Sequence, residues 1–254
     1  MLEDLAGRVA LVTGGATGIG GAISRAYGKA RMKVAVHYMA GKDDAEKVAA
    51  DIRVAGGEAL ILQADITLTG AAEKLVAETV TKFGRLDVLV NNAGGLVART
   101  AVGEIDDRFY DRVMDLNVRS LVHAAQAAVV EMRKSGGGSI INVSSISART
   151  GGSPGSSIYS GAKAFVSTFT RSLAREAAPD KIRVNALSPG TIATAFHARH
   201  STPDKLEATR KSIPLGRLGV AEDCAGTALF LASDAMSGYV TGQVIEINGG
   251  QLMA

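Results

Sequence analysis

Residues 9–20 read VALVTGGATGIG, and the fold of the chain can be predicted from this stretch. The first four residues are apolar throughout, as in a strand that is covered on both faces. Glycines follow at positions 14, 18 and 20, and the sequence then becomes helical. A backbone without Cβ atoms turns sharply and approaches a ligand closely, and a helix N-terminus offers unpaired N–H groups to a phosphate. This strand, glycine turn and helix therefore predict a phosphate site, against the alternative of a purely structural turn.

Apolar runs and helical segments alternate along the rest of the chain. The expected strands are Val9–Val12, Val34–Tyr38, Leu60–Gln63, Leu86–Val90, Ser139–Val143, Ile182–Ala186 and Val244–Ile247. The expected helices span residues 18–30, 43–55, 70–83, 104–134, 157–178 and 220–233. This alternation predicts an α/β protein with a doubly wound, seven-stranded parallel sheet and helices on both faces.

No linker interrupts this pattern, so we expect residues 1–254 to form a single domain. The longest region without a strand spans residues 191–219. Long connections in compact domains usually carry function, so we expect this segment to cover the substrate.

Composition excludes several classes of protein. Cys224 is the only cysteine, so there is no disulfide framework, and the four histidines lack metal-binding spacing, so no metal is expected. No apolar run approaches the roughly 18 residues of a membrane span. The net charge of +3 comes from interspersed charges, which gives no basis for nucleic-acid binding. The opening MLEDLAGRVALVTG has no signal pattern, so we expect a cytoplasmic protein.

Three further motifs follow in order: Asn91–Gly94 (NNAG), Tyr159–Lys163 (YSGAK) and Pro189–Thr194 (PGTIAT). Together with the glycine turn they resemble the short-chain dehydrogenase/reductase family, especially its 3-oxoacyl-carrier-protein reductase-like members. The resemblance extends from about residue 7 to residue 250. It implies a single-domain Rossmann fold and an enzyme that transfers hydride between a nicotinamide and a carbonyl or secondary alcohol.

The Tyr159–Lys163 pair is the candidate catalytic centre. The two residues are four apart at the start of an expected helix, so they share one face. Because an ammonium favours phenolate, we expect Lys163 to lower the pKa of Tyr159 toward working pH. A surface pair at helical spacing is the alternative. The resemblance implies that Tyr159 exchanges the proton and that Ser145 positions the carbonyl, with Ser144 and Ser147 as rivals.

Asn117 is a poor residue for the interior of the expected helix 104–134. The resemblance implies that Asn117 perturbs this helix and holds a water that links Lys163 to solvent. An exposed polar helix residue is the alternative.

The resemblance also implies a set of cofactor contacts. They are Gly14, Thr17, Gly18, Ile19, Gly20, His37, Tyr38, Asp65, Ile66, Asn91, Ala93, Gly94, Tyr159, Lys163, Pro189, Gly190, Ile192 and Thr194. In this set Asp65 contacts the adenine amine, although a helix cap is its alternative role. Asn92 is expected to stabilise the sheet.

No acid follows the expected strand Val34–Tyr38 until Asp43, so nothing there repels a ribose 2′-phosphate. His37 and Lys42 are the cations available to meet one. NADP(H) is therefore favoured, with NAD(H) as the alternative. Thr17 stands where many NADP-linked relatives carry a basic residue, which argues for NAD(H).

The substrate is less defined. Candidate walls of its pocket are Leu96, Val97, Ser147, Gly152 and Phe196. A 3-oxoacyl substrate is one candidate and a sugar, polyol or other small alcohol is the other. Carrier-protein docking in the family uses basic residues near helix ends, where this chain has Gly136 and Asp180. Docking of a carrier protein is therefore doubtful.

Apolar residues on more than one face of helices 104–134 and 157–178 resemble those that form a homotetramer in the family. Two other classes of protein stand as distant alternatives. A dinucleotide-sensing regulator without turnover usually loses the Tyr or the Lys, and both are present here. A serine hydrolase using Ser144 or Ser145 needs a G-x-S-x-G turn and a partner His, and neither is evident near that strand.

Overall fold

The computed structural model describes residues 2–194 and 202–253. Its centre is a seven-stranded sheet in the order β3-β2-β1-β4-β5-β6-β7, and every neighbouring pair is parallel. The strands are β1 (Val9–Val12), β2 (Lys33–Tyr38), β3 (Glu58–Gln63), β4 (Val88–Asn91), β5 (Gly138–Val143), β6 (Ile182–Pro189) and β7 (Val244–Ile247). The doubly wound α/β architecture is confirmed.

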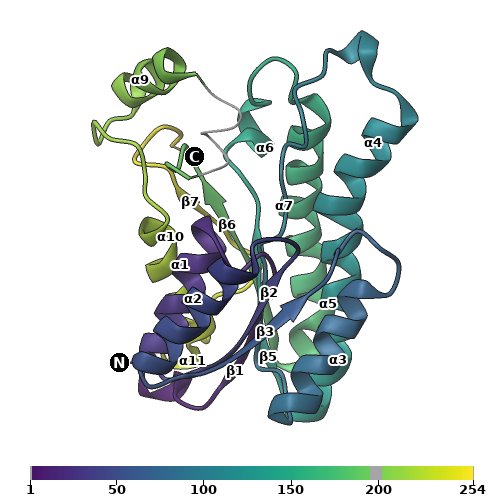
Figure 1. The fold of residues 1–254 in the computed structure, drawn as a ribbon, viewed down its shortest axis with the longest axis vertical. Helices are drawn as coiled ribbons and strands as arrows, with labels where there is room; N and C mark the ends of the chain where they lie inside the picture. The colour runs from purple at the N-terminus through teal and green to yellow at the C-terminus, as the bar shows by residue number, and fades with distance from the viewer. Residues whose placement is uncertain (1, 195–201, 254) are drawn as a thin grey trace.

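Helices cover both faces of the sheet (Figure 1). One face carries α1 (Gly18–Lys29), α2 (Lys42–Val54) and α10 (Glu222–Ala232). The other face carries α3 (Ala71–Phe83), α5 (Ser120–Ser135) and α7 (Ser157–Ala177). Each helix layer buries its apolar side against the sheet and forms a separate hydrophobic core with it. The central strands β1, β4 and β6 are buried throughout, which explains why they lack a polar alternation.

Shorter helices occupy the ends of the sheet. They are α4 (Asp107–Met114), α6 (Ser147–Thr150), α9 (Pro203–Ser212) and α11 (Asp234–Ser237), with the 3-10 turns Glu3–Leu5, Val102–Glu104 and Ala178–Asp180. In Figure 1, α6 and α9 lie toward the carboxyl ends of the strands, and α11 and the N-terminus lie at the opposite end. No helix among the described residues is both long enough and apolar enough to cross a bilayer.

The expected helix over residues 104–134 is wrong as a single element. It is divided into α4, a π-helical turn over Asp115–Arg119, and α5. The Asn117 side chain explains the break, because it donates to the Val113 carbonyl of its own helix and to the Gly95 carbonyl outside it. Such π-turns inside helices are frequent at functional sites.

Other boundaries differ by a few residues. Strand β6 extends to Pro189 rather than ending at Ala186, because its last residues pair with β7. Of the expected substrate-covering segment 191–219, residues 195–201 lie outside the described part, and Phe196 lies there too. The described residues of the segment include helix α9.

Candidate active site

The expected site residues follow the carboxyl ends of five strands. The glycine turn follows β1, Asp65 follows β3, Gly94 follows β4, Ser145 follows β5 and Gly190 follows β6. In a doubly wound sheet the ligand crevice opens at this edge, where the strand order reverses between β1 and β4. The fold therefore gathers onto one edge residues that are far apart in sequence.

The glycine turn is tightly closed. Gly14 and Gly18 have φ angles of +61° and +52°, which residues with a Cβ rarely adopt. A Cβ on Gly20 would overlap the Gly14 carbonyl and come within 2.5 Å of Asn92 Nδ2. Gly18 lies at the start of α1 with Thr194 beside it, since a Cβ there would be 3.6 Å from Thr194 Cγ2. This backbone cradle fits a dinucleotide phosphate at the helix N-terminus.

The β4 side anchors the turn through Thr13 and Asn92. Thr13 Oγ1 accepts hydrogen bonds from the N–H groups of Asn92 and Ala93, at 2.9 and 3.0 Å. Asn92 Nδ2 donates to the carbonyls of Thr13 and Gly14. These bonds hold Ala93 and Gly94 next to the glycine turn that follows β1.

Asn91 and Asn92 are neighbours in sequence but have different side-chain partners. Asn91 is buried, and its Nδ2 donates to Asn142 Oδ1 at 3.0 Å, so the Asn91 side chain joins β4 to β5. Asn92, expected to stabilise the sheet, bonds to the glycine turn instead. Successive side chains of a strand point to opposite faces, and this alternation gives the two asparagines different surroundings.

His37 does not present a cation to a phosphate, contrary to expectation. Its ring is buried, with Nδ1 accepting from the Gly14 N–H and Nε2 lying 3.1 Å from the Ala64 carbonyl. Burial lowers the pKa of His37 below its ordinary value. Lys42, the other expected cation, forms an exposed pair with Glu46.

Three other expected cofactor contacts have side chains directed partly or wholly into the core. Tyr38 and Ile66 are buried, and Ile19 packs against the core. Asp65 Oδ1 accepts from the Thr67 N–H and hydroxyl, and these bonds hold the Asp65 pKa below its usual value. Because α3 begins only at Ala71, Asp65 caps a turn rather than that helix.

Ser145 and Tyr159 are brought together at the crevice. Ser145 Oγ accepts from the N–H and the hydroxyl of Ser147, at 3.1 and 2.9 Å. With its lone pairs engaged in this way, Ser145 forms the hydrogen bond to Tyr159 that lowers the Tyr159 pKa. Ser144 points elsewhere: its hydroxyl donates to the Lys163 carbonyl at 2.9 Å and contacts Ser167 Oγ. The geometry thus separates the three candidate serines.

Lys163 lies one helical turn after Tyr159 on α7. Its Nζ is 5.8 Å from the centre of the Tyr159 ring and donates to the Val143 carbonyl at 2.8 Å. Burial lowers the pKa of Lys163 to about 8. Burial also raises the pKa of Tyr159 to about 12, with the Ser145 bond acting in the opposite direction. Contrary to expectation, the Tyr159 pKa is raised rather than lowered, because burial outweighs the hydrogen bond from Ser145.

Asn117 connects the π-turn to this centre. Its Oδ1 accepts from the Gly95 N–H at 3.0 Å, and its Nδ2 donates to the Gly95 carbonyl at 2.9 Å. A Cβ on Gly94 would lie 2.8 Å from Asn117 Oδ1 and 3.0 Å from Lys163 Nζ. The absence of a side chain at Gly94 therefore lets Asn117 and Lys163 approach each other. Asn117 is buried, so the exposed-helix alternative is excluded.

The segment after β6 completes the crevice. The Gly190 N–H donates to the Ile247 carbonyl at 2.9 Å, and a Cβ on Gly190 would lie 2.7 Å from that of Asn248. Ile192 is buried and pairs with Gly219 as a short parallel bridge. A cavity of about 230 Å³ opens beside this segment, lined in part by Ile192, Gly219 and Asn248.

Two features were missed by sequence reasoning. Ser144 fastens the end of β5 to the α7 carbonyl of Lys163, which no motif indicates. Val97 has a φ of +65°, and the Ala98 N–H donates to the Leu96 carbonyl across it at 2.8 Å, a strained γ-turn. The sequence gives no signal for this strain, because β-branched residues avoid that region.

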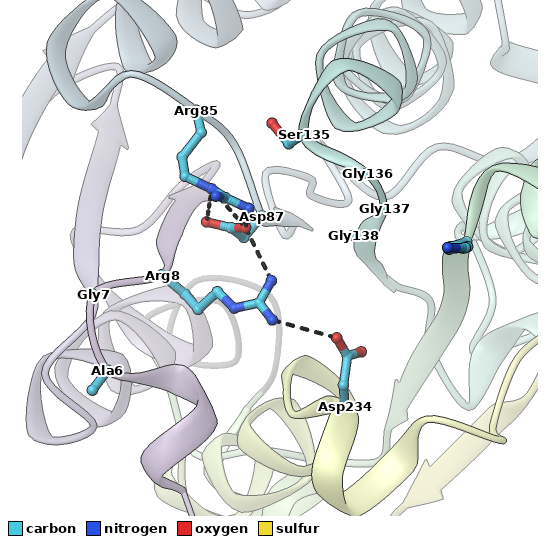
Figure 2. A pocket seen from close by; sticks show the side chains of 11 residues that line it. Ala6, Gly7, Arg8, Arg85, Asp87, Ser135, Gly136, Gly137, Gly138 and Asp234 are labelled. Carbon is cyan, nitrogen blue, oxygen red and sulfur yellow. Dashed lines mark hydrogen bonds and ion pairs between the residues drawn. The ribbon is translucent and has the colours of Figure 1, made fainter.

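A separate cavity of about 550 Å³ lies at the opposite, amino edge of the sheet (Figure 2). Its wall contains Asp87, which pairs with Arg8 at 3.1 Å and Arg85 at 2.6 Å and accepts from the Val9 N–H. Arg8 also approaches Asp234. These bonds join β1, β4 and α11, so the ion pairs have a structural role far from the crevice.

Comparisons with known proteins show which family the chain resembles. A family model described as enoyl-(acyl carrier protein) reductase matches residues 14–251. An uncharacterized oxidoreductase of Methylorubrum extorquens is 42% identical over 98% of this chain and 99% of its own length. The 3-oxoacyl-[acyl-carrier-protein] reductase of Synechocystis is 39% identical over 99% of this chain and 100% of its own. A crystal structure of the NADH-dependent reductase A1-R′ complexed with NAD superposes with a TM-score of 0.89 at 37% identity, and each chain is covered fully.

The ordered motifs, the parallel sheet and relatives that match over nearly the full length lead to one assignment. The chain belongs to the short-chain dehydrogenase/reductase family, the oxidoreductases that interconvert carbonyl and hydroxyl groups with a nicotinamide cofactor.

Proposed function

We propose that this protein transfers hydride reversibly between NADP(H) and the carbonyl or secondary alcohol of a small molecule. The observation that carries the proposal is the hydrogen-bonded series Ser147–Ser145–Tyr159 with Lys163 one turn away, next to a glycine cradle. A dinucleotide bound in that cradle supplies the hydride. The protein supplies orientation and a proton.

The protein's own residues would act as follows. Ser145, fixed by the two Ser147 donors, directs its hydroxyl toward the substrate oxygen, and Tyr159 donates to the same atom. Both donors stabilise negative charge where it develops. Tyr159 delivers the proton during reduction and removes it during oxidation. Lys163, held by the Val143 carbonyl, places its positive charge beside the ring and favours phenolate when Tyr159 gives up its proton.

The remaining polar groups would hold the cofactor. The glycine turn from Gly14 to Gly20, with Thr17 and Ile19, would bind the phosphates. Asp65, whose Oδ1 accepts from Thr67, would accept from the adenine amine. The residues Pro189, Gly190, Ile192 and Thr194 would surround the nicotinamide. Thr194 lies next to Gly18, which supports one continuous binding surface.

NADP(H) is proposed as the preferred cofactor because no carboxylate follows β2 before Asp43. The NADH dependence of the A1-R′ reductase makes NAD(H) the alternative. Initial rates with NADPH and NADH at equal concentrations test the preference. A clear excess of the NADH rate overturns it.

For the substrate there are two candidates, a 3-oxoacyl group, as in the Synechocystis relative, and a small sugar-like or polyol carbonyl. Arg133 at the end of α5 is bonded to Asp180 at 2.7 Å, and Lys134 is bonded to Glu131 at 2.7 Å. These cations are neutralised within the chain, which disfavours docking of an acidic carrier protein and favours a free small molecule. The test compares a 3-oxoacyl group on a carrier protein with the same group on a short thiol. A large preference for the carrier form contradicts the free-substrate proposal.

The general test is a panel of ketones and aldehydes with NADPH and of alcohols with NADP⁺, followed by the nicotinamide absorbance. Turnover that depends on Tyr159 supports the function. Dinucleotide binding without turnover of any carbonyl or alcohol favours the regulator instead.

We also propose a homotetramer built on α5 and α7. Phe165 and Phe169 stack at 5.7 Å on α7, and Phe165 and Val130 are exposed. Several other apolar residues of these helices are buried within the chain, so the exposed surface is smaller than the sequence indicates. Sedimentation velocity measures the assembly, and a monomer contradicts the proposal.

A further inference from the structure

His37 has both ring nitrogens engaged by main-chain groups from two different segments. The Gly14 N–H donates to Nδ1 at 3.0 Å, and Nε2 lies 3.1 Å from the Ala64 carbonyl. The ring is 2% exposed. The backbone of the same residue adds a third bond, because its carbonyl accepts from the Gly15 N–H at 2.8 Å.

The partners fix the state of the ring. Gly14 N–H can only donate, so Nδ1 carries no proton, and the Ala64 carbonyl can only accept, so Nε2 carries one. The imidazole is thus held neutral as the Nε2–H tautomer. Protonation of Nδ1 would place its new N–H opposite the Gly14 N–H, and because both groups are donors the bond to Gly14 would break.

Both segments belong to the proposed dinucleotide site. Gly14 opens the phosphate turn, and Ala64 immediately precedes Asp65, the proposed adenine contact. Asn92 holds the turn from the β4 side, so His37 is its counterpart on the β2 side. On the basis of the proposed function, we propose that His37 is a positioning residue that sets the glycine turn and the Asp65 segment at the spacing a dinucleotide needs.

Glycines make such an anchor necessary. A turn that contains Gly14 and Gly15 and leads into Gly18 has more backbone freedom to lose on ordering than a turn of residues with a Cβ. Bonds that order the turn before the ligand arrives reduce this entropic cost, so they appear as affinity.

The neutral ring also makes the anchor sensitive to acid. Burial lowers the pKa of His37, while the hydrogen bond to the Ala64 carbonyl and the charge of Asp65 act in the opposite direction. Asp65 is the charged group that acts on the ring, because the glycine turn presents only backbone amides. The pKa of His37 in its buried, bonded position lies below 6.5, the pKa of a free histidine. As the pH falls, a His37 ring released from its two bonds is therefore protonated before a bonded one. The anchor is intact above about 6.5, the ordinary histidine pKa, and weakens below it.

Three substitutions separate the two ring bonds. His37→Asn puts an amide oxygen near the place of Nδ1 and keeps an acceptor for Gly14. His37→Gln reaches the place of Nε2 and keeps a donor for Ala64 but leaves the Gly14 N–H without its acceptor. His37→Phe removes both. The probe is NADP⁺ or NAD⁺, whichever the unsubstituted protein binds more tightly, with affinity measured by calorimetry.

We expect His37→Gln and His37→Phe to weaken dinucleotide binding about tenfold, and His37→Asn to restore most of the loss. In turnover, KM for the dinucleotide should rise more than kcat falls. Between pH 7.5 and 5.5 the unsubstituted protein should lose affinity relative to His37→Asn, a comparison in which the titration of the ligand itself cancels.

A core truncation serves as the control for general destabilisation. Val34→Ala shortens a buried side chain at the other end of β2 and should lower the unfolding temperature without changing dinucleotide affinity. Equal affinities of His37→Gln, His37→Asn and the unsubstituted protein overturn the inference. So does a loss in Val34→Ala as large as that in His37→Phe.

A measurement without dinucleotide separates this inference from the proposed function. Amide exchange at Gly14 should accelerate in His37→Gln and not in His37→Asn. If the unsubstituted protein binds neither dinucleotide, the proposed function fails. If the amide exchange rate of Gly14 is unchanged in His37→Gln, the proposed positioning role of His37 is wrong.

Discussion

Lys163 Nζ lies 5.8 Å from the centre of the Tyr159 ring, and its hydrogen bond goes to the Val143 carbonyl at the end of β5. The ammonium therefore lies over the phenol ring while a strand carbonyl holds it in place. Its position depends on the strand that also leads to Ser145. Ser144, which lies between Val143 and Ser145 in sequence, donates to the Lys163 carbonyl and so joins α7 to the end of β5. One strand end thus holds all three proposed catalytic groups in place.

Tyr159→Phe removes the phenol oxygen and leaves the ring. We expect turnover to fall by at least about a thousandfold, because general acid catalysis and carbonyl polarisation are both lost. Dinucleotide affinity should change little. Turnover is followed at the nicotinamide absorbance and affinity by calorimetry, and near-normal turnover refutes the role of Tyr159.

Ser145→Ala and Ser144→Ala form a matched pair of neighbouring serines. Loss of a positioned donor to the developing charge should reduce kcat about a hundredfold in Ser145→Ala. Ser144→Ala loses bonds to Lys163 and Ser167 and should instead cost about 1 kcal/mol of unfolding free energy, with a much smaller fall in kcat. Steady-state kinetics and urea unfolding separate the two. The reverse pattern would make Ser144 the catalytic serine.

Lys163→Met should change how stability depends on pH. Burial lowers the Lys163 pKa to about 8 from its ordinary 10.5. Between these values the unfolded chain binds more protons than the folded one, so unfolding free energy rises with pH in the unsubstituted protein. Below pH 8 both states are protonated and the burial penalty is constant.

Relative to Lys163→Met, the unsubstituted protein should therefore gain stability from about pH 8 to 10, by up to about 3 kcal/mol. The variant should lack turnover at every pH. Urea unfolding across this range tests the expectation. A stability difference that stays constant with pH shows that Lys163 titrates normally.

Val97→Gly relieves backbone strain in the loop after β4. A β-branched residue at φ +65° is unfavourable and glycine is not, so unfolding free energy should rise by roughly 1 kcal/mol. Val102→Gly at an exposed position of the nearby 3-10 turn should lower it. If Val97 shapes the substrate pocket, KM for the carbonyl changes as well. A drop in stability for Val97→Gly indicates that side-chain packing outweighs the strain.

Asp87→Asn tests the ion pairs at the amino edge of the sheet, shown in Figure 2. The carboxylate is 1% exposed and binds two guanidinium groups and the Val9 N–H. Its neutralisation should cost about 3 kcal/mol of unfolding free energy, with kcat per folded molecule unchanged. The exposed pair of Arg25 and Asp51 is the comparison, since Asp51→Asn should cost under about 1 kcal/mol. Equal effects of the two changes contradict a structural role for Asp87.

The sequence alone determined the α/β class, the parallel sheet and the helical spacing of Tyr159 and Lys163, whereas it left Ser144 and Ser147 as rivals of Ser145. It did so because apolar strands, helical spacing and glycine turns are local properties, written in short stretches such as residues 9–20. The separation of Tyr159 and Lys163 by four residues also fixes their shared helical face without any knowledge of the fold.

Only the tertiary structure decided what each side chain contacts. The His37 ring bonds to the glycine turn, Asn91 joins β4 to β5 while Asn92 holds the glycine turn, and burial raises the Tyr159 pKa. The physical reason is that hydrogen bonding and desolvation depend on neighbours brought from distant strands. The π-turn at Asn117 follows the same rule, since it forms around a bond to Gly95 across the crevice.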